Sequence, residues 1–162
     1  MALHGNLNPM PSPILDRFID AQSGSEGVGY EAALAELMAG RKTSHWIWYV
    51  LPQLRVLGRS ALAKEYGLVD SSEASAYMAH PVLGPRLLEC VRALWVHHGK
   101  GAVAVLGEVD AVKLRSCLTL FEHAAPYEPV FGLALERLYG GVRDTATLDL
   151  IAQEPIEGDA TP

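Results

Sequence analysis

One segment of the chain, residues 42–54 (KTSHWIWYVLPQL), gathers polar and aromatic side chains of the kinds that bind small ligands. It holds two of the three tryptophans, together with a lysine, a histidine and a glutamine. We expect Ser44 to cap a short helix over residues 45–51, so that free backbone N–H groups lie beside the ammonium group of Lys42. Helix N-terminal donors, a cation and aromatic walls together make a site for a small anion.

The same segment also has a purely structural interpretation. Aromatic side chains dominate protein cores, and Ser44 would then serve only as a helix cap. Trp46 and Trp48 lie two residues apart and point to different faces of a helix, so that one can pack inward while the other lines a pocket. His45 is either a core histidine or, if the site performs chemistry, the candidate acid or base, because imidazole groups titrate near neutral pH.

A second group of polar residues shares one face of a helix expected over residues 111–124, with Asp110 as its N-cap. Lys113, Ser116 and Thr119 follow one another at intervals of three, which places a cation and two hydroxyl groups on one stripe. Such a stripe suits a phosphate group or another polar ligand. The alternative is a solvated helix face that binds nothing.

Other chemistry finds no support in the spacing of residues. Neither a phosphate-binding glycine loop nor a dinucleotide fingerprint is present, and we expect no cofactor. His97 and His98 are adjacent, the remaining histidines show no ligand spacing, and we expect no metal site. Cys90 and Cys117 fall on apolar helix faces, where thiols are usually small, buried and unreactive side chains.

The composition narrows the class of protein. Of 162 residues, 49% are hydrophobic and 20% charged, with a formal net charge of −6. These values are typical of a soluble globular domain and disfavour binding to nucleic acid or to an anionic membrane surface. No apolar run approaches the roughly 20 residues of a membrane span. Two cysteines form no disulfide framework, so we expect a cytoplasmic location.

The elements that must position these residues are helices. Glycines, prolines and capping residues divide the chain into short segments of helical periodicity, and the run Ala102–Leu106 is ambiguous. The segment 81–98, which His80 is expected to cap, is apolar around most of its surface and therefore belongs in the centre. We predict an all-α fold: one compact domain of several short helices around that central helix, in an irregular orthogonal array. The expected domain covers residues 13–153, between flexible tails at residues 1–12 and 154–162.

Several stretches together resemble a bacterial family called domain of unknown function 1810, whose members are often labelled calpastatin. The resemblance covers roughly residues 15–153 and implies a compact all-helical fold, without an established activity. Calpastatin itself is disordered and rich in proline and charge, which this apolar chain is not. The stretches are DRFIDAQ (16–22), the segment 42–54, LGRS (57–60), HPVLGPRL (80–87), DAVKLRSCLTLF (110–121) and LYGG (138–141).

The resemblance also implies that the two polar groups form one pocket. Cys117 stands where the family pattern has serine, which argues further against a nucleophilic thiol. The residues assigned to this pocket are Lys42, Ser44, His45, Trp46, Trp48, Pro52, Gln53, Lys113, Ser116 and Thr119.

Two functions follow as hypotheses. In the first, the pocket binds a small anionic or phosphorylated ligand, such as a nucleotide, an ADP-ribose-like compound or a sugar phosphate. Lys42 and Lys113 would then balance its charge, Ser44 would hold phosphate oxygens, and a tryptophan would stack on a ring. In the second, the chain is a helical protein–protein interaction module without a small ligand, anchored through Trp46, Trp48 and Tyr49.

Overall fold

The computed structural model describes residues 14–155, and this part of the chain is helical throughout, with no extended strand. The fold is therefore all-α, as predicted, and the ambiguous run Ala102–Leu106 is a helix. The expected N-terminal tail, and residues 156–162 of the expected C-terminal tail, lie outside the described residues. The elements are α1 Asp16–Asp20, the π-helix η2 Ala21–Ser25, α2 Tyr30–Met38, α3 Ile47–Val50, the 3-10 helix η3 Arg55–Leu57, α4 Ala61–Glu65, α5 Ser71–Ala79, α6 Leu83–Trp95, α7 Ala102–Leu106, α8 Glu108–Ala124, α9 Val130–Tyr139 and α10 Thr145–Ala152.

Local chemistry explains several helix ends. Ser60 accepts a hydrogen bond from the Ala63 amide at 3.1 Å, and Asp70 caps α5 through the Glu73 amide at 2.9 Å. In both caps a short side-chain oxygen satisfies an otherwise unpaired N–H group of the first turn. Helix α9 stops at Gly140, whose positive φ of 60° suits glycine best.

Two expected caps are wrong. Helix α3 begins at Ile47 and not at His45. Its N-cap residue is Trp46, so Ser44 lies two residues before the N-cap and does not cap the helix. Helix α8 begins at Glu108, one residue after Gly107, so Asp110 lies inside the first turn. In both helices the N-cap residue makes no side-chain capping hydrogen bond. A search of the sequence for capping side chains therefore cannot find where these helices begin.

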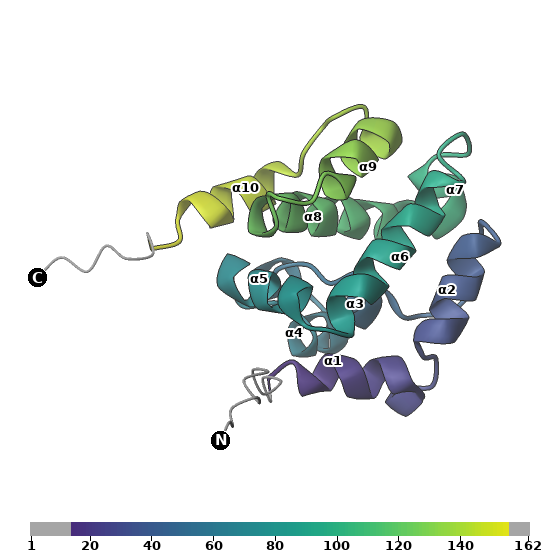
Figure 1. Ribbon diagram of the computed structural model, residues 1–162, viewed down its shortest axis with the longest axis horizontal. Helices are drawn as coiled ribbons and strands as arrows, with labels where there is room; N and C mark the ends of the chain where they lie inside the picture. Colours follow the sequence, from purple (N-terminus) through teal and green to yellow (C-terminus); the bar gives the residue numbers. More distant parts are fainter. Residues whose placement is uncertain (1–13, 156–162) are drawn as a thin grey trace, which may run out of the picture.

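Two helices share the centre of the fold. Helix α6, the predicted central helix, packs against α2, α5 and α9 and runs diagonally through the middle of the molecule (Figure 1). Helix α8 is longer and packs against α5, α7, α9 and α10. The helices cross in several directions, and α1 and α2 lie on the opposite side of α6 from α10 (Figure 1).

A row of aromatic rings runs through the core. Phe18 of α1 meets Tyr77 of α5 at 5.1 Å between ring centroids, and Tyr77 meets Phe121 of α8 at 5.5 Å. Phe121 in turn lies 5.7 Å from Phe131 of α9. These rings are fully buried, and edge or offset contacts of this kind add to the hydrophobic stabilisation. No helix among the described residues is long and apolar enough to cross a membrane.

Candidate functional site

A groove of about 580 Å³ lies between the segment 53–63, the N-terminal half of α8 and the start of α10. We call it the α8 groove. One wall is apolar, and the remaining residues carry amide, hydroxyl and charged groups. The apolar wall includes Leu57, Val109 and Val112, and the polar residues are Gln53, Arg59, Ser60, Lys113, Ser116 and Asp144.

Backbone pairing fixes the segment that forms one side of the groove. Leu54 and Leu68 make an isolated parallel bridge, in which the Arg55 amide donates to the Leu68 carbonyl at 2.7 Å. The Leu68 amide donates to the Gln53 carbonyl at 2.9 Å. Gln53 therefore has a fixed backbone at the inner end of the groove, although it belongs to no helix.

A much smaller cavity, of about 10 Å³, adjoins the α8 groove and shares Gln53, Ala63 and Lys113 with it. Trp48 lines this inner cavity, and its indole Nε1 is buried without a hydrogen-bond partner among the described residues. The volume is close to what one water molecule or one ligand oxygen needs. A buried N–H group without an acceptor is costly, by about 1–3 kcal/mol, so an acceptor in this cavity is favoured.

Lys113 brings a cation to the same place. Its ammonium lies 5.4 Å from the centre of the Trp48 ring and 3.6 Å from Asp110 Oδ1, and its side chain is 25% exposed. The other oxygen of Asp110 lies 2.8 Å from the Lys42 ammonium. One carboxylate thus stands between two lysines, and the group retains a net positive charge.

Lys42 itself is a structural residue. Its side chain is only 5% exposed, donates to the Ser44 carbonyl and lies 4.9 Å from the centre of the Trp46 ring. Together with the ion pair to Asp110, these contacts fasten the chain before α3 to α8. Lys42 lines neither the α8 groove nor the inner cavity.

Glu36 of α2 occupies the place where we expected a bound anion. Its Oε1 accepts hydrogen bonds from the amides of Thr43 and Ser44, at 2.8 and 3.0 Å, and from Trp46 Nε1 at 2.9 Å. Burial opposes ionisation, but hydrogen bonds from Ser44, Trp46 and Thr43 prevail and lower the pKa of Glu36 to about 2. The spacing of residues gave no signal for Glu36, because α2 reaches this turn only through tertiary packing.

The predicted pocket therefore comes together in part. Trp48, Gln53, Lys113 and Ser116 line the two cavities. The side chain of His45 is exposed and its ring lies 6.5 Å from that of Trp48, outside both linings. The buried residues among the remainder have structural roles: Trp46 and Pro52 are core residues, and Thr119 accepts a hydrogen bond from the Asp144 amide at 3.0 Å.

Sequence reasoning missed three polar groove residues, Asp144, Arg59 and Ser60, of which the last two are neighbours in the sequence. Arg59 is exposed, and no hydrogen bond or ion pair to its side chain is recorded within residues 14–155. Arg59 and Ser60 belong to the stretch LGRS, which carried the family resemblance without a role in the predicted pocket. The stretch LGRS was therefore the sequence signal from which Arg59 and Ser60 could have been identified.

His80 and the two cysteines have structural positions. His80 is buried and its Nδ1 accepts from the amides of Val82 and Leu83, at 3.1 and 3.3 Å. Its side chain therefore caps the start of α6, although α6 begins at Leu83 and its N-cap residue is Val82, two positions after the expected one. Cys90 and Cys117 are buried and free, and burial raises the pKa of Cys90 to about 12 and that of Cys117 as well. No group of three or more His, Cys, Asp or Glu residues within 14–155 is placed to hold a metal ion.

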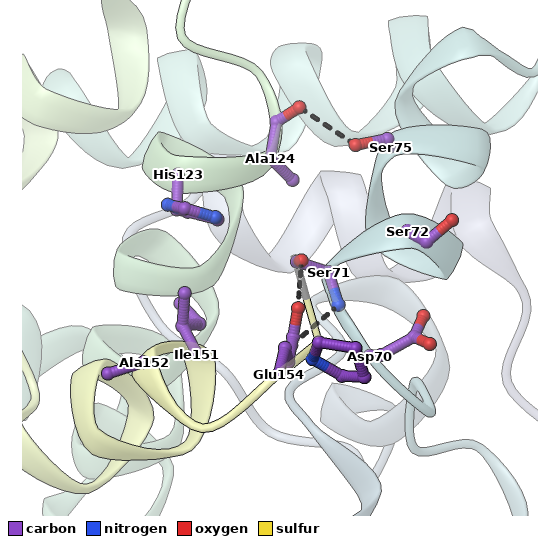
Figure 2. Close-up of a pocket in the computed structure, with 10 residues that line it drawn as sticks. Asp70, Ser71, Ser72, Ser75, His123, Ala124, Ile151, Ala152 and Glu154 are labelled. Atoms are coloured by element: carbon purple, nitrogen blue, oxygen red, sulfur yellow. Dashed lines mark hydrogen bonds between the residues drawn. The ribbon is translucent and has the colours of Figure 1, made fainter. Parts of the chain in front are cut away.

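Figure 2 shows a further cavity, of about 830 Å³, where α5 meets the ends of α8 and α10. The Ser71 amide donates to Glu154 at 3.0 Å, the Ser71 hydroxyl donates to the same carboxylate, and the Ser75 hydroxyl donates to the Ala124 carbonyl at 3.0 Å. Glu154 is thus bonded to the first residue of α5. The described residues that line this cavity include no Lys or Arg, so its charge does not suit an anionic ligand.

Comparisons with known proteins agree with the resemblance. The model of a family described as "Protein of unknown function (DUF1810)" matches residues 13–151. The structure is similar to the crystal structure of the conserved hypothetical protein Rv1873 from Mycobacterium tuberculosis, with a TM-score of 0.82 and 41% sequence identity, over 86% of this chain and 97% of that chain. No curated protein matches the chain. Because the family match spans most of the sequence, the chain belongs to the DUF1810 family.

Proposed function

We propose that the α8 groove binds a small phosphorylated molecule, such as a nucleotide, an ADP-ribose-like compound or a sugar phosphate. The observation that carries this proposal is at Trp48. Its buried N–H group has no partner within residues 14–155, and its side chain lines a cavity of about one oxygen atom beside the Lys113 ammonium. A phosphate oxygen in that cavity would accept from the indole and would meet a positive charge. The neighbouring Gln53 side chain adds an amide donor.

The rest of the groove suits the remainder of such a ligand. A volume of about 580 Å³ lies within the range of small-molecule pockets. Arg59 supplies a second cation at its rim, while Leu57, Val109 and Val112 offer apolar surface for a sugar or a base. These two cations outnumber the one carboxylate in the groove lining, that of Asp144, so the local charge attracts an anion even though the chain as a whole carries a net charge of −6.

The alternative, a protein interaction module anchored on aromatic residues of the segment 42–54, receives less support. Trp46 and Tyr49 are 0% and 1% exposed, so neither presents a ring to a partner. Trp48 is half-buried, and its side chain lines the inner cavity. Interface anchors are side chains that a partner can cover, which these two buried rings are not.

A cytoplasmic location forms part of the proposal. Both cysteines are reduced and buried, as is usual where thiols are kept reduced. Phosphorylated metabolites and nucleotides also abound in that compartment.

Thermal unfolding of the wild-type chain with AMP, ADP-ribose, NAD and glucose 6-phosphate tests the proposal. A ligand at a hundred times its Kd adds about 2.7 kcal/mol, which raises the Tm of a chain of this length by roughly 5–10 °C. We expect such a shift with at least one of the four compounds. Lys113→Gln and Trp48→Phe should each remove most of it, because the first loses the charge and the second loses the N–H donor together with part of the indole ring.

The matched control is Lys64→Gln, since Lys64 is also a helical lysine but is exposed and lines neither cavity. It should retain the full shift. The proposal is wrong if the folded wild-type chain shows no shift with any of the four compounds, or if the shift survives in both Lys113→Gln and Trp48→Phe.

A further inference from the structure

Another cavity, of about 480 Å³, lies between the π-helix η2, the start of α2 and α6. It shares no lining residue with the α8 groove. We propose that this cavity is a separate binding site for an oxyanion, a carboxylate or phosphate group of a small molecule, which Arg86 would bind. The inference does not depend on the proposed function of the α8 groove.

Arg86 is a half-buried cation without a counter-ion. No carboxylate within the described residues lies in ion-pair distance of its guanidinium, in contrast to Arg17 and Arg143. The nearby carboxylate of Glu89, one turn along α6, instead accepts the hydroxyl hydrogen bond of Tyr30. A guanidinium group keeps its charge and has five N–H donors, and partial burial makes an acceptor for them more valuable.

The position of Arg86 is set by its neighbours. Its Nη1 donates to Gln22 Oε1 at 3.2 Å, and its guanidinium carbon lies 4.8 Å from the centre of the Tyr30 ring. Gln22 is only 4% exposed, and its Nε2 donates to the Tyr49 carbonyl at 2.8 Å and to the Tyr77 hydroxyl at 3.1 Å. These two bonds direct the amide oxygen of Gln22 toward Arg86. The arginine is therefore held in place before any ligand arrives, which lowers the entropic cost of binding.

Part of the cavity lining is backbone, at Gly29. Gly29 lines the cavity, and a Cβ atom there would lie 2.7 Å from the Gln22 carbonyl oxygen, so η2 and α2 approach too closely for any other residue. No side chain caps the first turn of α2, which begins at Tyr30. Residues 30–32 of this turn line the cavity, so its free amides would add donors to those of Arg86 in the proposed site. Short π-helical segments such as η2 are frequent at functional sites.

Glu31 also lines this cavity, and its side chain is exposed. A carboxylate at the rim weakens the binding of an anion by charge repulsion. The site therefore makes two opposite predictions. Removal of the Arg86 charge should weaken oxyanion binding, and removal of the Glu31 charge should strengthen it.

Amide and arginine Nε–H resonances, followed by NMR during separate titrations with inorganic phosphate and with acetate, test this inference. We expect saturable shifts at Arg86 and at residues 29–32 with one or both ions. If only one ion saturates, it identifies the oxyanion as phosphate or as carboxylate. Residues 57–60 and 109–116 report the α8 groove in the same spectra, so the two sites are judged separately.

The variants make the test specific. Arg86→Gln should weaken the apparent affinity roughly tenfold or more, as expected for the loss of a charge-assisted hydrogen bond. Arg92→Gln, the same change at an exposed arginine of α6, should leave it unchanged, and Glu31→Gln should increase it. If Arg86→Gln fails to fold, the test still rests on the other two variants: the affinity should rise in Glu31→Gln and stay the same in Arg92→Gln. The inference is overturned if neither ion gives saturable shifts at residues 29–32, or if Glu31→Gln and Arg92→Gln bind alike.

Discussion

At the scale of single residues, Glu36 is the clearest example of a charged group used for structure. Its carboxylate accepts hydrogen bonds from two backbone amides that precede α3 and from the indole N–H of Trp46. An internal anion thus satisfies donors that, from sequence alone, were available to a ligand. The cation next to them, Lys42, is likewise neutralised from within by Asp110.

The depressed pKa of Glu36 predicts a pH dependence of stability. Because the folded state lowers this pKa from 4.5 to about 2, the ionised carboxylate stabilises the fold above pH 4.5. That stabilisation is lost as the pH falls toward 2. Glu36→Gln should therefore cost about 1–2 kcal/mol of unfolding free energy at pH 7, a value typical of hydrogen bonds to a charged group. Urea unfolding of wild type and variant at pH 7 and at pH 3 measures the unfolding free energy at each pH.

The difference between wild type and Glu36→Gln should shrink at pH 3. Asp149→Asn is the control, since Asp149 is exposed, and it should change little at either pH. A Glu36→Gln variant as stable as wild type at pH 7 would contradict the assigned role.

The residues of the α8 groove show what a single sequence can predict about a site. Lys113 and Ser116 were identified because helical spacing is a local property that holds wherever the helix packs. The ion pair between Lys42 and Asp110 was not predicted, since it joins residues that are 68 positions apart in the sequence and lie on separate elements. Pairings of that kind depend on which helices meet, and neither spacing nor residue type determines that.

At the scale of elements, the turn between α5 and α6 depends on close backbone approach. A Cβ atom at Gly84 would lie 2.1 Å from the Met78 carbonyl oxygen, a contact with backbone that no rotamer change relieves. Gly84→Ala should lower the unfolding free energy by about 1–3 kcal/mol, the usual cost of forcing extra atoms into a packed core. Chemical denaturation measures it directly.

Gly99→Ala is the matched control, because nothing lies within 4 Å of its added Cβ and its φ is not positive. It should stay within about 0.5 kcal/mol of wild type, as surface substitutions do. Equal effects of the two substitutions would refute the importance of the α5–α6 approach.

Helices were easier to predict than their first residues. Ser60, Asp70 and His80 are caps whose oxygen or nitrogen atoms bond amides within three residues, so the sequence contains both partners. Helices α3 and α8 begin without a side-chain cap. Their first turns are set by packing, and the expected starts at Ser44 and Asp110 were wrong for that reason.

At the scale of the whole molecule, Glu154 joins the end of the described chain to its middle. Its bonds to Ser71 span 83 positions and tie the chain just after α10 to the first turn of α5 (Figure 2). Glu154→Ala should lower the unfolding free energy by about 1–2 kcal/mol, since both bonds involve a charged acceptor. At this chain length that corresponds to a fall in Tm of roughly 2–8 °C.

Calorimetry measures the change, with Gln153→Ala as a control at the neighbouring exposed position. The control should melt within about one degree of wild type, in line with the small effect of most surface substitutions. If the two variants melt at the same temperature, Glu154 does not secure α10.

The row of rings in the core also governs how the domain comes apart. Phe18, Tyr77, Phe121 and Phe131 belong to α1, α5, α8 and α9, so a continuous line of contacts crosses the molecule from its first described helix nearly to its last. No seam divides these helices into halves that could melt independently. Loss of any one ring contact weakens its neighbours, and cooperative, all-or-none unfolding is the consequence.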